Sequence, residues 1–138
     1  MKRGGARLAL LFAGLLLFYV VGVVVRGQFG IRILVSNQSG EILRYVVLKE
    51  ETHGPRYELG DLGDGFSRRI FIRPRTESHV AMSFQDASGT LHSEVVVGYL
   101  ESGYCGSAVA IVLPGGKVKA NERIDTLSCK GSWVDFLR

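Results

Sequence analysis

The sequence has few of the residues that build metal centres and redox sites. It holds two cysteines, Cys105 and Cys129, and three histidines among 138 residues. The cysteines do not form a Cys-x-x-Cys redox motif, and neither has the close cysteine neighbour that structural zinc sites use. The histidines His53, His79 and His92 follow no metal-binding spacing. We therefore predict scattered surface histidines, no metal and no cofactor.

Sequence motifs of catalysis are also missing. Serines are numerous, but no Gly-x-Ser-x-Gly segment occurs. The glycine-rich segment 60–65 lacks the Lys-Ser/Thr pair of a P-loop and the alternating ligands of an EF-hand, so a turn between strands explains it. No catalytic residue is predicted. A site assembled from distant loops would leave no such motif, and for that reason an enzyme stays an alternative.

The positive charge of the chain is concentrated at its N-terminus. The formal net charge is +4. Four of the 17 Lys and Arg residues, Lys2, Arg3, Arg7 and Arg26, flank an apolar segment without any acidic counterpart. The other 13 are balanced by the 13 Asp and Glu residues. Because a nucleic-acid-binding domain carries a basic face of its own, we expect no nucleic-acid partner.

The single long apolar run, residues 8–25, contains no charged residue and no polar amide. As a helix it would extend about 27 Å, close to the roughly 30 Å of a bilayer hydrocarbon core. A secretory signal peptide is the alternative, but the run exceeds the usual core of about 7–15 residues, and no Ala-x-Ala-like cleavage site follows. We therefore predict an uncleaved transmembrane anchor, and we assign residues 1–26 to a cytoplasmic stub and this anchor.

Charge bias predicts the orientation of the anchor. Three basic residues, Lys2, Arg3 and Arg7, precede the run, whereas Arg26 and Arg32 follow it. The positive-inside tendency then leaves the N-terminus in the cytoplasm. We expect a single-pass inner-membrane protein with its domain in the periplasm or outside the cell. Ala9 and Ala13 form a small-x-x-x-small pair, a weak indication of a homodimer through the anchor.

Cys105 and Cys129 both fall in the predicted external domain. Two cysteines in an oxidising compartment favour one disulfide bond. It would close a loop of about 25 residues and contribute roughly 3–4 kcal/mol in the chain-entropy model. Two reduced cysteines are the alternative, and the disulfide depends on the predicted orientation.

Short strand-like segments separated by turn residues make up the rest of the chain. About seven are recognisable, over residues 31–36, 42–49, 66–73, 79–85, 91–99, 107–113 and 117–124. We predict an all-β domain over residues 27–124, a small antiparallel β-sandwich of immunoglobulin-like type, with a small β-barrel as the alternative. Residues 125–138 form a C-terminal tail, predicted to pack on or beside the domain.

Two groups of residues are candidates for partner binding. Tyr99, Glu101 and Tyr104 lie between glycines at the end of a predicted strand, and loops at the ends of sandwiches often carry recognition. Trp133 and Phe136 lie in the tail at helical spacing. A strand-to-strand corner and a lid closing the sandwich are the structural alternatives.

Arg69 and Arg73 are a candidate anion-binding pair. Alternation along a strand would place both on one face. They could bind an anionic surface or an envelope polymer. Pairing with Glu77, Glu94 or Glu101 on neighbouring strands is the alternative, which the neutral charge of the domain favours.

The layout of an N-terminal anchor and a small sandwich resembles that of many bacterial cell-envelope proteins. The sequence departs from copper-delivery members of that group, which need clustered Cys, His or Met, and it lacks the pilin-like entry signature. We expect a membrane-tethered binding or assembly module, with another envelope protein as its partner. An envelope enzyme or enzyme inhibitor and a secreted domain released by signal cleavage are the alternatives.

Overall fold

The computed structural model of the chain describes residues 11–22, 30–51 and 53–125. Residues 11–22 are helical, and all of their side chains are exposed. No helix in these described ranges is long and apolar enough to cross a membrane. The predicted span of residues 8–25 extends beyond both ends of the described helix, so the anchor remains a prediction.

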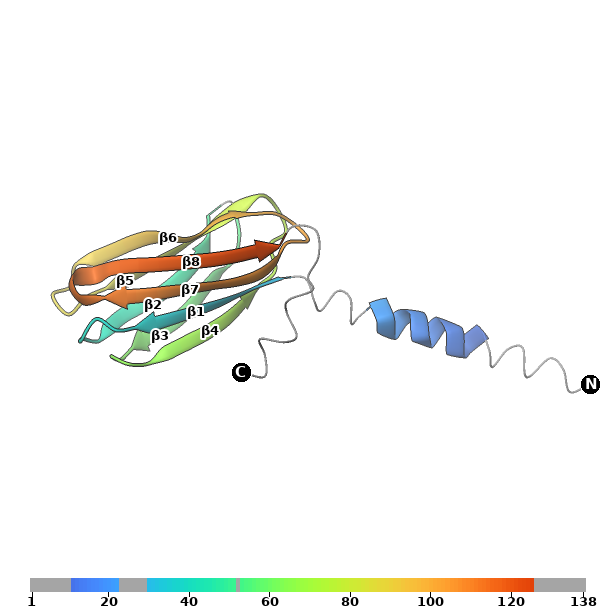
Figure 1. Cartoon of the computed structure of the whole chain (residues 1–138), viewed down its shortest axis with the longest axis horizontal. Coiled ribbons are helices and arrows are strands. Elements are labelled where there is room, and N and C mark those ends of the chain that lie inside the picture. Colours follow the sequence, from blue (N-terminus) through green and yellow to red (C-terminus); the bar gives the residue numbers. More distant parts are fainter. Residues whose placement is uncertain (1–10, 23–29, 52, 126–138) are drawn as a thin grey trace, which may run out of the picture.

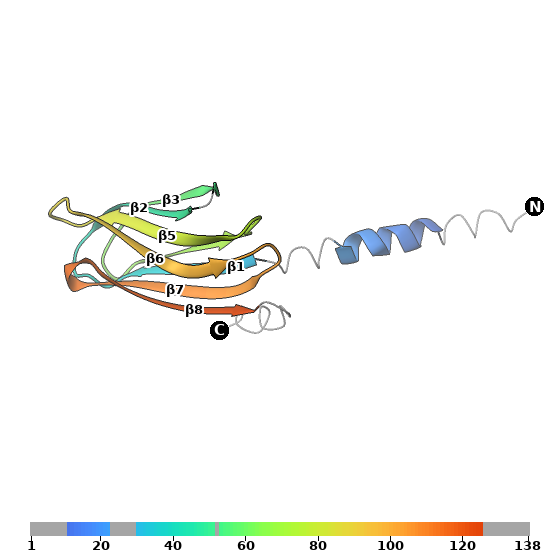
Figure 2. The same cartoon turned by 90° about the horizontal axis from the view of Figure 1, so that it is seen from above.

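Eight strands follow in the described part of the chain (Figure 1). They are β1 (Gly30–Asn37), β2 (Leu43–Glu50), β3 (Arg56–Leu62), β4 (Ser67–Ile72), β5 (Ser78–Gln85), β6 (Leu91–Leu100), β7 (Cys105–Leu113) and β8 (Lys117–Asp125), with a short 3-10 turn at Pro114–Gly116. They form two four-stranded sheets in the orders β4-β1-β7-β8 and β3-β2-β5-β6. Figure 2 shows these sheets as two layers, which confirms an all-β sandwich.

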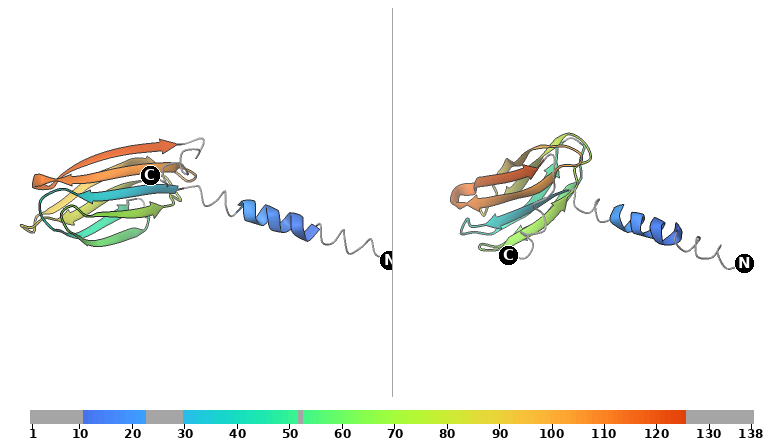
Figure 3. Two further views of the ribbon diagram at one scale, coloured as in Figure 1. Left: turned by 60° about the horizontal axis from the view of Figure 1, so that its bottom comes forward. Right: turned by 45° about the vertical axis from the view of Figure 1, so that its right-hand side comes forward.

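The sandwich departs from the predicted antiparallel, immunoglobulin-like type in two respects. β1 pairs with β7 in parallel, with Gly30 opposite Cys105, so an entirely antiparallel sandwich is wrong for this pair. In Figure 3, β1 accordingly lies between β7 and β4. In an immunoglobulin domain the first two strands are neighbours in one sheet. Here β1 and β2 lie in different sheets, so the sandwich shares the layers of that fold but not its order.

The strand that the sequence did not predict is β3. Glycine and aspartate in the segment 60–65 indicate a turn, yet residues 56–62 pair with β2. β3 is an edge strand with exposed polar residues on one side and Tyr57, Leu59 and Leu62 on the other. Because an edge strand needs only one apolar face and one pairing partner, its sequence signal is weak.

The core lies between the two sheets and follows the period-two alternation of the strands. β5 shows it most regularly, because Val80, Met82 and Phe84 are fully buried, as predicted, while the residues between them are partly exposed. Facing them from the other sheet are Ile31, Ile33 and Val35 of β1. Tyr57, Leu59, Ile70, Tyr104, Val118 and Ile124 pack around this cluster.

The two ends of the sandwich differ. β1 begins at Gly30, opposite the start of β7 and beside the end of β4 at Ile72. We call this the entry end. The connections from β2 to β3, from β4 to β5 and from β6 to β7 all lie there, because these strand pairs alternate in direction. The opposite, far end carries the connections from β1 to β2, from β3 to β4, from β5 to β6 and from β7 to β8.

Asn37 joins two loops of the far end. Its fully buried side-chain amide donates to the carbonyl oxygens of Glu41 at 2.7 Å and of Leu62 at 2.8 Å. Its side-chain oxygen accepts from the Ser39 backbone N–H at 3.0 Å and from the Ser39 hydroxyl at 2.7 Å. The end of β1, the following loop and the end of β3 are therefore held by one side chain.

Candidate functional site

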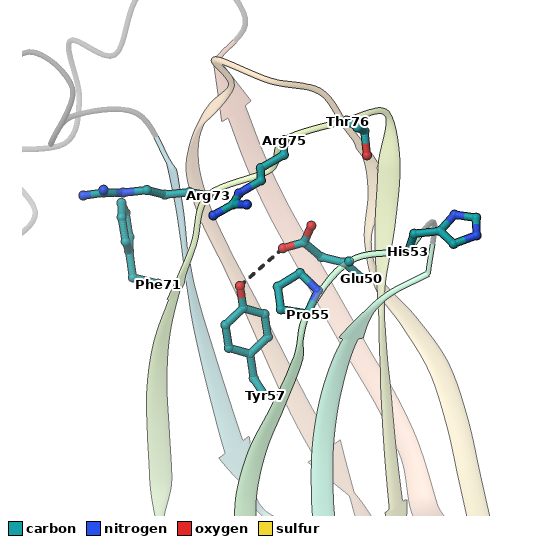
Figure 4. Close-up of a pocket in the computed structure, with 9 residues that line it drawn as sticks. Glu50, His53, Pro55, Tyr57, Phe71, Arg73, Arg75 and Thr76 are labelled. Atoms are coloured by element: carbon teal, nitrogen blue, oxygen red, sulfur yellow. Dashed lines mark hydrogen bonds between the residues drawn. The ribbon is translucent and has the colours of Figure 1, made fainter.

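The entry end contains a pocket of about 640 Å³, in the size range of small-molecule sites. It opens where the β2–β3 connection of one sheet faces the end of β4 in the other (Figure 4). The lining residues come from these two segments: Glu50, His53, Gly54, Pro55, Tyr57, Phe71, Arg73, Arg75 and Thr76. They include several chargeable groups, whereas the core beneath them is apolar.

Glu50 is the most buried of the chargeable groups in the pocket. It pairs with Val80 in the register of β2 and β5, two residues after the core position Leu48, and so faces the sandwich interior. The residue is 3% exposed, and one carboxyl oxygen lies 3.4 Å from the hydroxyl of Tyr57, which donates to it. Burial raises the pKa of Glu50, while the Tyr57 hydrogen bond and the charge of Arg75 act in the opposite direction.

The β2–β3 connection closes tightly over Glu50. The Glu50 backbone N–H donates to the carbonyl oxygen of Pro55 at 3.2 Å. A Cβ atom at Gly54 would collide with the Glu50 side chain, so only glycine lets the backbone approach this closely. Burial raises the pKa of Tyr57, and the negative charge of Glu50 raises it further. The carboxyl and the phenol therefore form a coupled pair at the pocket wall.

Two arginines stand at the mouth of the pocket, and buried Pro74 separates them. The proline restricts Arg73 to extended backbone, and Figure 4 shows the Arg73 side chain directed away from Glu50 and Tyr57. The guanidinium of Arg73 lies 5.3 Å from the ring centroid of Phe71, a cation-π contact that holds it beside the pocket. Figure 4 shows Arg75 reaching down toward Glu50 and Tyr57.

Neither arginine forms a close ion pair among the described residues, although the charge of Arg75 acts on Glu50. The ion pairs found there join Lys49 to Glu51, Arg56 to Glu58 and His92 to Asp86. The alternative in which arginines on this strand pair with Glu77, Glu94 or Glu101 is therefore not observed. Arg73 lines the pocket as part of the predicted anion site. Arg69 does not line the pocket. It lies earlier on β4, nearer the far end, opposite Leu34 of β1.

His53 lines the same pocket without joining its chemistry. The residue has a left-handed backbone conformation with φ of 62° and is exposed. Figure 4 shows its ring directed away from Glu50 and Tyr57. A general acid–base pair requires the two groups within hydrogen-bonding reach of one reacting atom. The structure brings the histidine and the carboxyl into one pocket but does not direct them at a common point.

The predicted tyrosine site is brought together at the entry end. Tyr99 and Tyr104 form an edge-to-face pair with ring centroids 6.0 Å apart. The Tyr104 backbone N–H donates to the carbonyl oxygen of Glu101 at 3.1 Å, which closes the β6–β7 turn. Tyr99 is 48% exposed, and Tyr104 packs partly against the core. Desolvation and then the charge of Glu101 raise the pKa of both tyrosines.

His92 is only partly exposed and has specific contacts at the far end. Its Nε2 lies 2.8 Å from a carboxylate oxygen of Asp86, and its ring stacks on Phe84 with centroids 5.0 Å apart. Gly116, with φ of 72°, passes so close that a Cβ there would collide with the ring. The Ser88 hydroxyl binds the other oxygen of Asp86. Together these contacts hold the β5–β6 turn in place at the far end, next to the β7–β8 connection.

Part of the predicted site lies outside the described residues. Cys129, Trp133 and Phe136 fall in residues 126–138, so neither the disulfide nor the docking face of the tail is tested. Cys105 is 2% exposed, and its Sγ lies 3.7 Å from the carbonyl oxygen of Asp125, its register partner on β8.

Sequence reasoning did not identify Glu50, Tyr57 or Arg75 as site residues. Arg75 belongs to the only basic cluster of the domain, which is a signal that could have been extended beyond Arg69 and Arg73. Glu50 carries a weaker signal, since it continues the inward-facing alternation of β2 with a charged residue. The partnership of Tyr57 with Glu50 depends on β3, which was not predicted.

Comparisons with known proteins give no family. No protein-family model matches the chain, and no curated protein is similar to it. A solved structure of a protein from Eubacterium rectale, determined by NMR, resembles the chain with a TM-score of 0.47 and 11% identity. The match covers 74% of this chain and 96% of that one. A likeness this distant has no bearing on function.

Proposed function

We propose that this protein is a membrane-tethered binding module of a bacterial-type cell envelope, with its sandwich outside the cytoplasm. The exposed apolar helix supports the tether. All of its large described side chains, from Leu11 to Val21, are about half exposed or more. A helix that is apolar on every face needs an apolar environment, and residues 8–25 together are long enough to find it in a bilayer.

The observation that carries the binding role is the gathering of recognition features at the entry end. The pocket around Glu50 and the tyrosine pair Tyr99 and Tyr104 both lie there. Only residues 27–29 separate Arg26 from Gly30, and four peptide steps extend at most about 14 Å. A tether of this length keeps the entry end close to the membrane surface, where a ligand or partner would be met.

A disulfide between Cys105 and Cys129 belongs to the same proposal. Cys105 is buried and stands opposite Asp125, the last residue of β8. Cys129 follows four residues later. The Cα atoms of a disulfide lie about 5–6 Å apart, so a short return of the chain after Asp125 suffices. An oxidising compartment would then stabilise the end of β8.

Site-specific photo-crosslinking tests the binding role. A photoreactive amino acid is placed at Tyr99, and in a matched variant at Tyr45, which is 66% exposed on β2. We expect one discrete membrane-fraction partner to be captured from position 99 and not from position 45. Equal capture from both positions, or a lone monomer in every detergent extract, contradicts the proposal.

An envelope enzyme is the second candidate, and Glu50 is the feature that favours it. A carboxyl group with a raised pKa beside a phenol is an arrangement that general acids and bases use. The direction of the His53 ring favours the binding role over catalysis. Turnover of a ligand held in the pocket, measured as described below, would favour the enzyme.

A further inference from the structure

We propose that the pocket at the entry end binds a phosphate ester of a polyol, with the phosphate between Arg73 and Arg75 and a polyol hydroxyl at Glu50 and Tyr57. The inference rests on the proposed function in one respect, namely that the ligand comes from a cell envelope. It deepens that function by naming the ligand class.

The two arginines indicate an oxyanion with several oxygens. Each guanidinium presents a planar fork of donors that fits two oxygens. A carboxylate has only two oxygens in one plane and satisfies one fork, whereas the oxygens of a tetrahedral phosphate point in different directions: a monoester offers three terminal oxygens, and a lipid phosphodiester offers two terminal and two ester oxygens, so either can reach both arginines. Arg73 is held in place by Phe71, and Pro74 fixes the backbone between the arginines. Figure 4 shows Arg75 directed toward Glu50 and Tyr57 but Arg73 directed away from them, so a phosphate shared by both arginines requires the Arg73 side chain to leave Phe71 and turn toward the pocket.

The deeper part of the pocket suits a hydroxyl group. The Glu50 carboxylate accepts hydrogen bonds, and the Tyr57 hydroxyl both donates and accepts. A ligand hydroxyl can therefore bind both side chains at once. An anionic group at the same depth would lie against the buried carboxyl of Glu50, and we expect the phosphate to stay at the mouth near Arg75. This polarity sets the orientation of the ligand.

The pocket exceeds the volume of a single phosphate. At about 640 Å³ it leaves room for a polyol or a sugar beside the anion. Such an ester can be a free molecule or the head group of an anionic lipid. The short connection between Arg26 and the entry end makes both sources reachable, and the experiment separates them.

The test uses full-length protein in a nonionic detergent free of phosphate. Glycerol 3-phosphate is titrated and followed by calorimetry and by ³¹P NMR. Mixed micelles containing phosphatidylglycerol replace it in a second arm, and phosphatidylcholine micelles serve as the control. Saturable binding of free glycerol phosphate identifies a soluble ester as a ligand, and binding of phosphatidylglycerol alone identifies the lipid head group. Inorganic phosphate released from bound ester in the NMR spectrum would show turnover.

Three variants locate the site. R75Q should weaken binding about tenfold, because a charge-assisted hydrogen bond pair is lost. Y57F should weaken the binding of glycerol phosphate more than the binding of inorganic phosphate, because it removes only the contact with the polyol hydroxyl. R69Q is the matched control, because Arg69 lies on β4 shortly before Arg73 and Arg75 in the sequence but outside the pocket, and the affinity of this variant should be unchanged. Circular dichroism verifies the fold of each variant.

The proposal is overturned if neither glycerol phosphate nor phosphatidylglycerol binds saturably. It is also overturned if R75Q and R69Q weaken binding equally, which would indicate nonspecific attraction to positive charge. These outcomes do not depend on where the domain lies in the cell. Saturable binding with a cytoplasmic domain, found by the thiol measurement described in the Discussion, would overturn the proposed function and leave this inference standing.

Discussion

Glu50 illustrates how one residue can oppose the stability of the fold that holds it. It faces the interior, and burial raises its pKa despite the hydrogen bond from Tyr57. A folded-state pKa above the unfolded one means that the carboxyl binds protons more readily in the folded state. Its contribution to stability is then fully present below the ordinary value of 4.5 and is lost as pH rises through the raised value. Such a group suits a site better than a core.

The substitution E50Q tests this interpretation. Glutamine keeps the shape and an acceptor for Tyr57 but has no charge to desolvate. We expect the variant to be more stable than the wild type at neutral pH, with the advantage shrinking as pH falls toward 4.5. Urea unfolding at several pH values, followed by far-ultraviolet circular dichroism, measures the difference. A variant less stable at pH 7 would show that the charge of Arg75 outweighs the burial of Glu50.

Asp86 shows the opposite behaviour. The hydrogen bond from His92, with that of Ser88, lowers its pKa from the ordinary 3.8. A lowered folded-state pKa gives stability that is present above 3.8 and lost as pH falls below it. We therefore expect D86N to be less stable than the wild type at pH 6, with a difference that diminishes below about pH 4. Thermal unfolding across this range is the measurement.

A matched variant tests whether the loss of stability is specific to the contact between Asp86 and His92. Asp64 is also in a far-end turn and accepts from the Gly40 backbone N–H, but it has no histidine partner. D64N should lower the stability at pH 6 by less than D86N does, because it removes one exposed backbone contact and no contact with a histidine. Identical pH profiles for D86N and the wild type would mean that the contact with His92 does not hold in solution.

At the scale of elements, alternation predicts strands better than it predicts their neighbours. The buried positions of β5 follow from the sequence because Val80, Met82 and Phe84 are apolar every second residue. The parallel pairing of β1 and β7 does not follow from the sequence, because either strand could pair with several others and still bury its apolar face. β3 was missed because Gly60 and Asp61, residue types that favour turns over strands, lie inside it.

The candidate site was only partly predictable for the same reason. Arg73 was identified from its strand face, and Tyr99 and Tyr104 from their glycine-flanked segment. The pocket itself needs the end of β4 to face the β2–β3 connection across two sheets. Residue spacing along one strand does not tell which sheet ends face each other. Glu50 therefore becomes meaningful only once both sheets are placed.

Asn37 connects elements that have no strand pairing with each other. Its side chain binds the loop after β1 and the carbonyl oxygen of Leu62 at the end of β3. N37A would leave these buried groups without partners, and we expect a loss of about 1–3 kcal/mol in the free energy of unfolding. Denaturant titration measures it. N121A is the matched control, because Asn121 is exposed on β8, and it should change stability by less than about 0.5 kcal/mol.

A small effect of N37A would mean that water replaces the side chain in these contacts. A loss well above the expected range would indicate that the far-end loops fold together with the core. In the first case the turn after β3 should remain resistant to proteolysis. In the second, cleavage near residues 63–66 should appear in the variant alone.

At the scale of the whole molecule, the compartment that contains the domain decides whether its cysteines are oxidised or reduced. An external domain meets oxidising conditions, so a Cys105–Cys129 disulfide and an uncleaved anchor belong to one prediction. A cytoplasmic domain would keep both thiols reduced. A domain released by cleavage would lack the first residues. Each arrangement therefore has its own combination of mass and thiol count.

Intact mass of the membrane-extracted protein distinguishes these arrangements. Free thiols are blocked with an alkylating reagent before and after reduction. We expect the full-length mass with no label before reduction and two labels after it, because the anchor is retained and the cysteines are bonded. Labelling of both thiols at once would place the domain in the cytoplasm and contradict the proposed function. A shorter chain with a protected pair would identify a secreted domain, whose entry end would no longer be held near the bilayer.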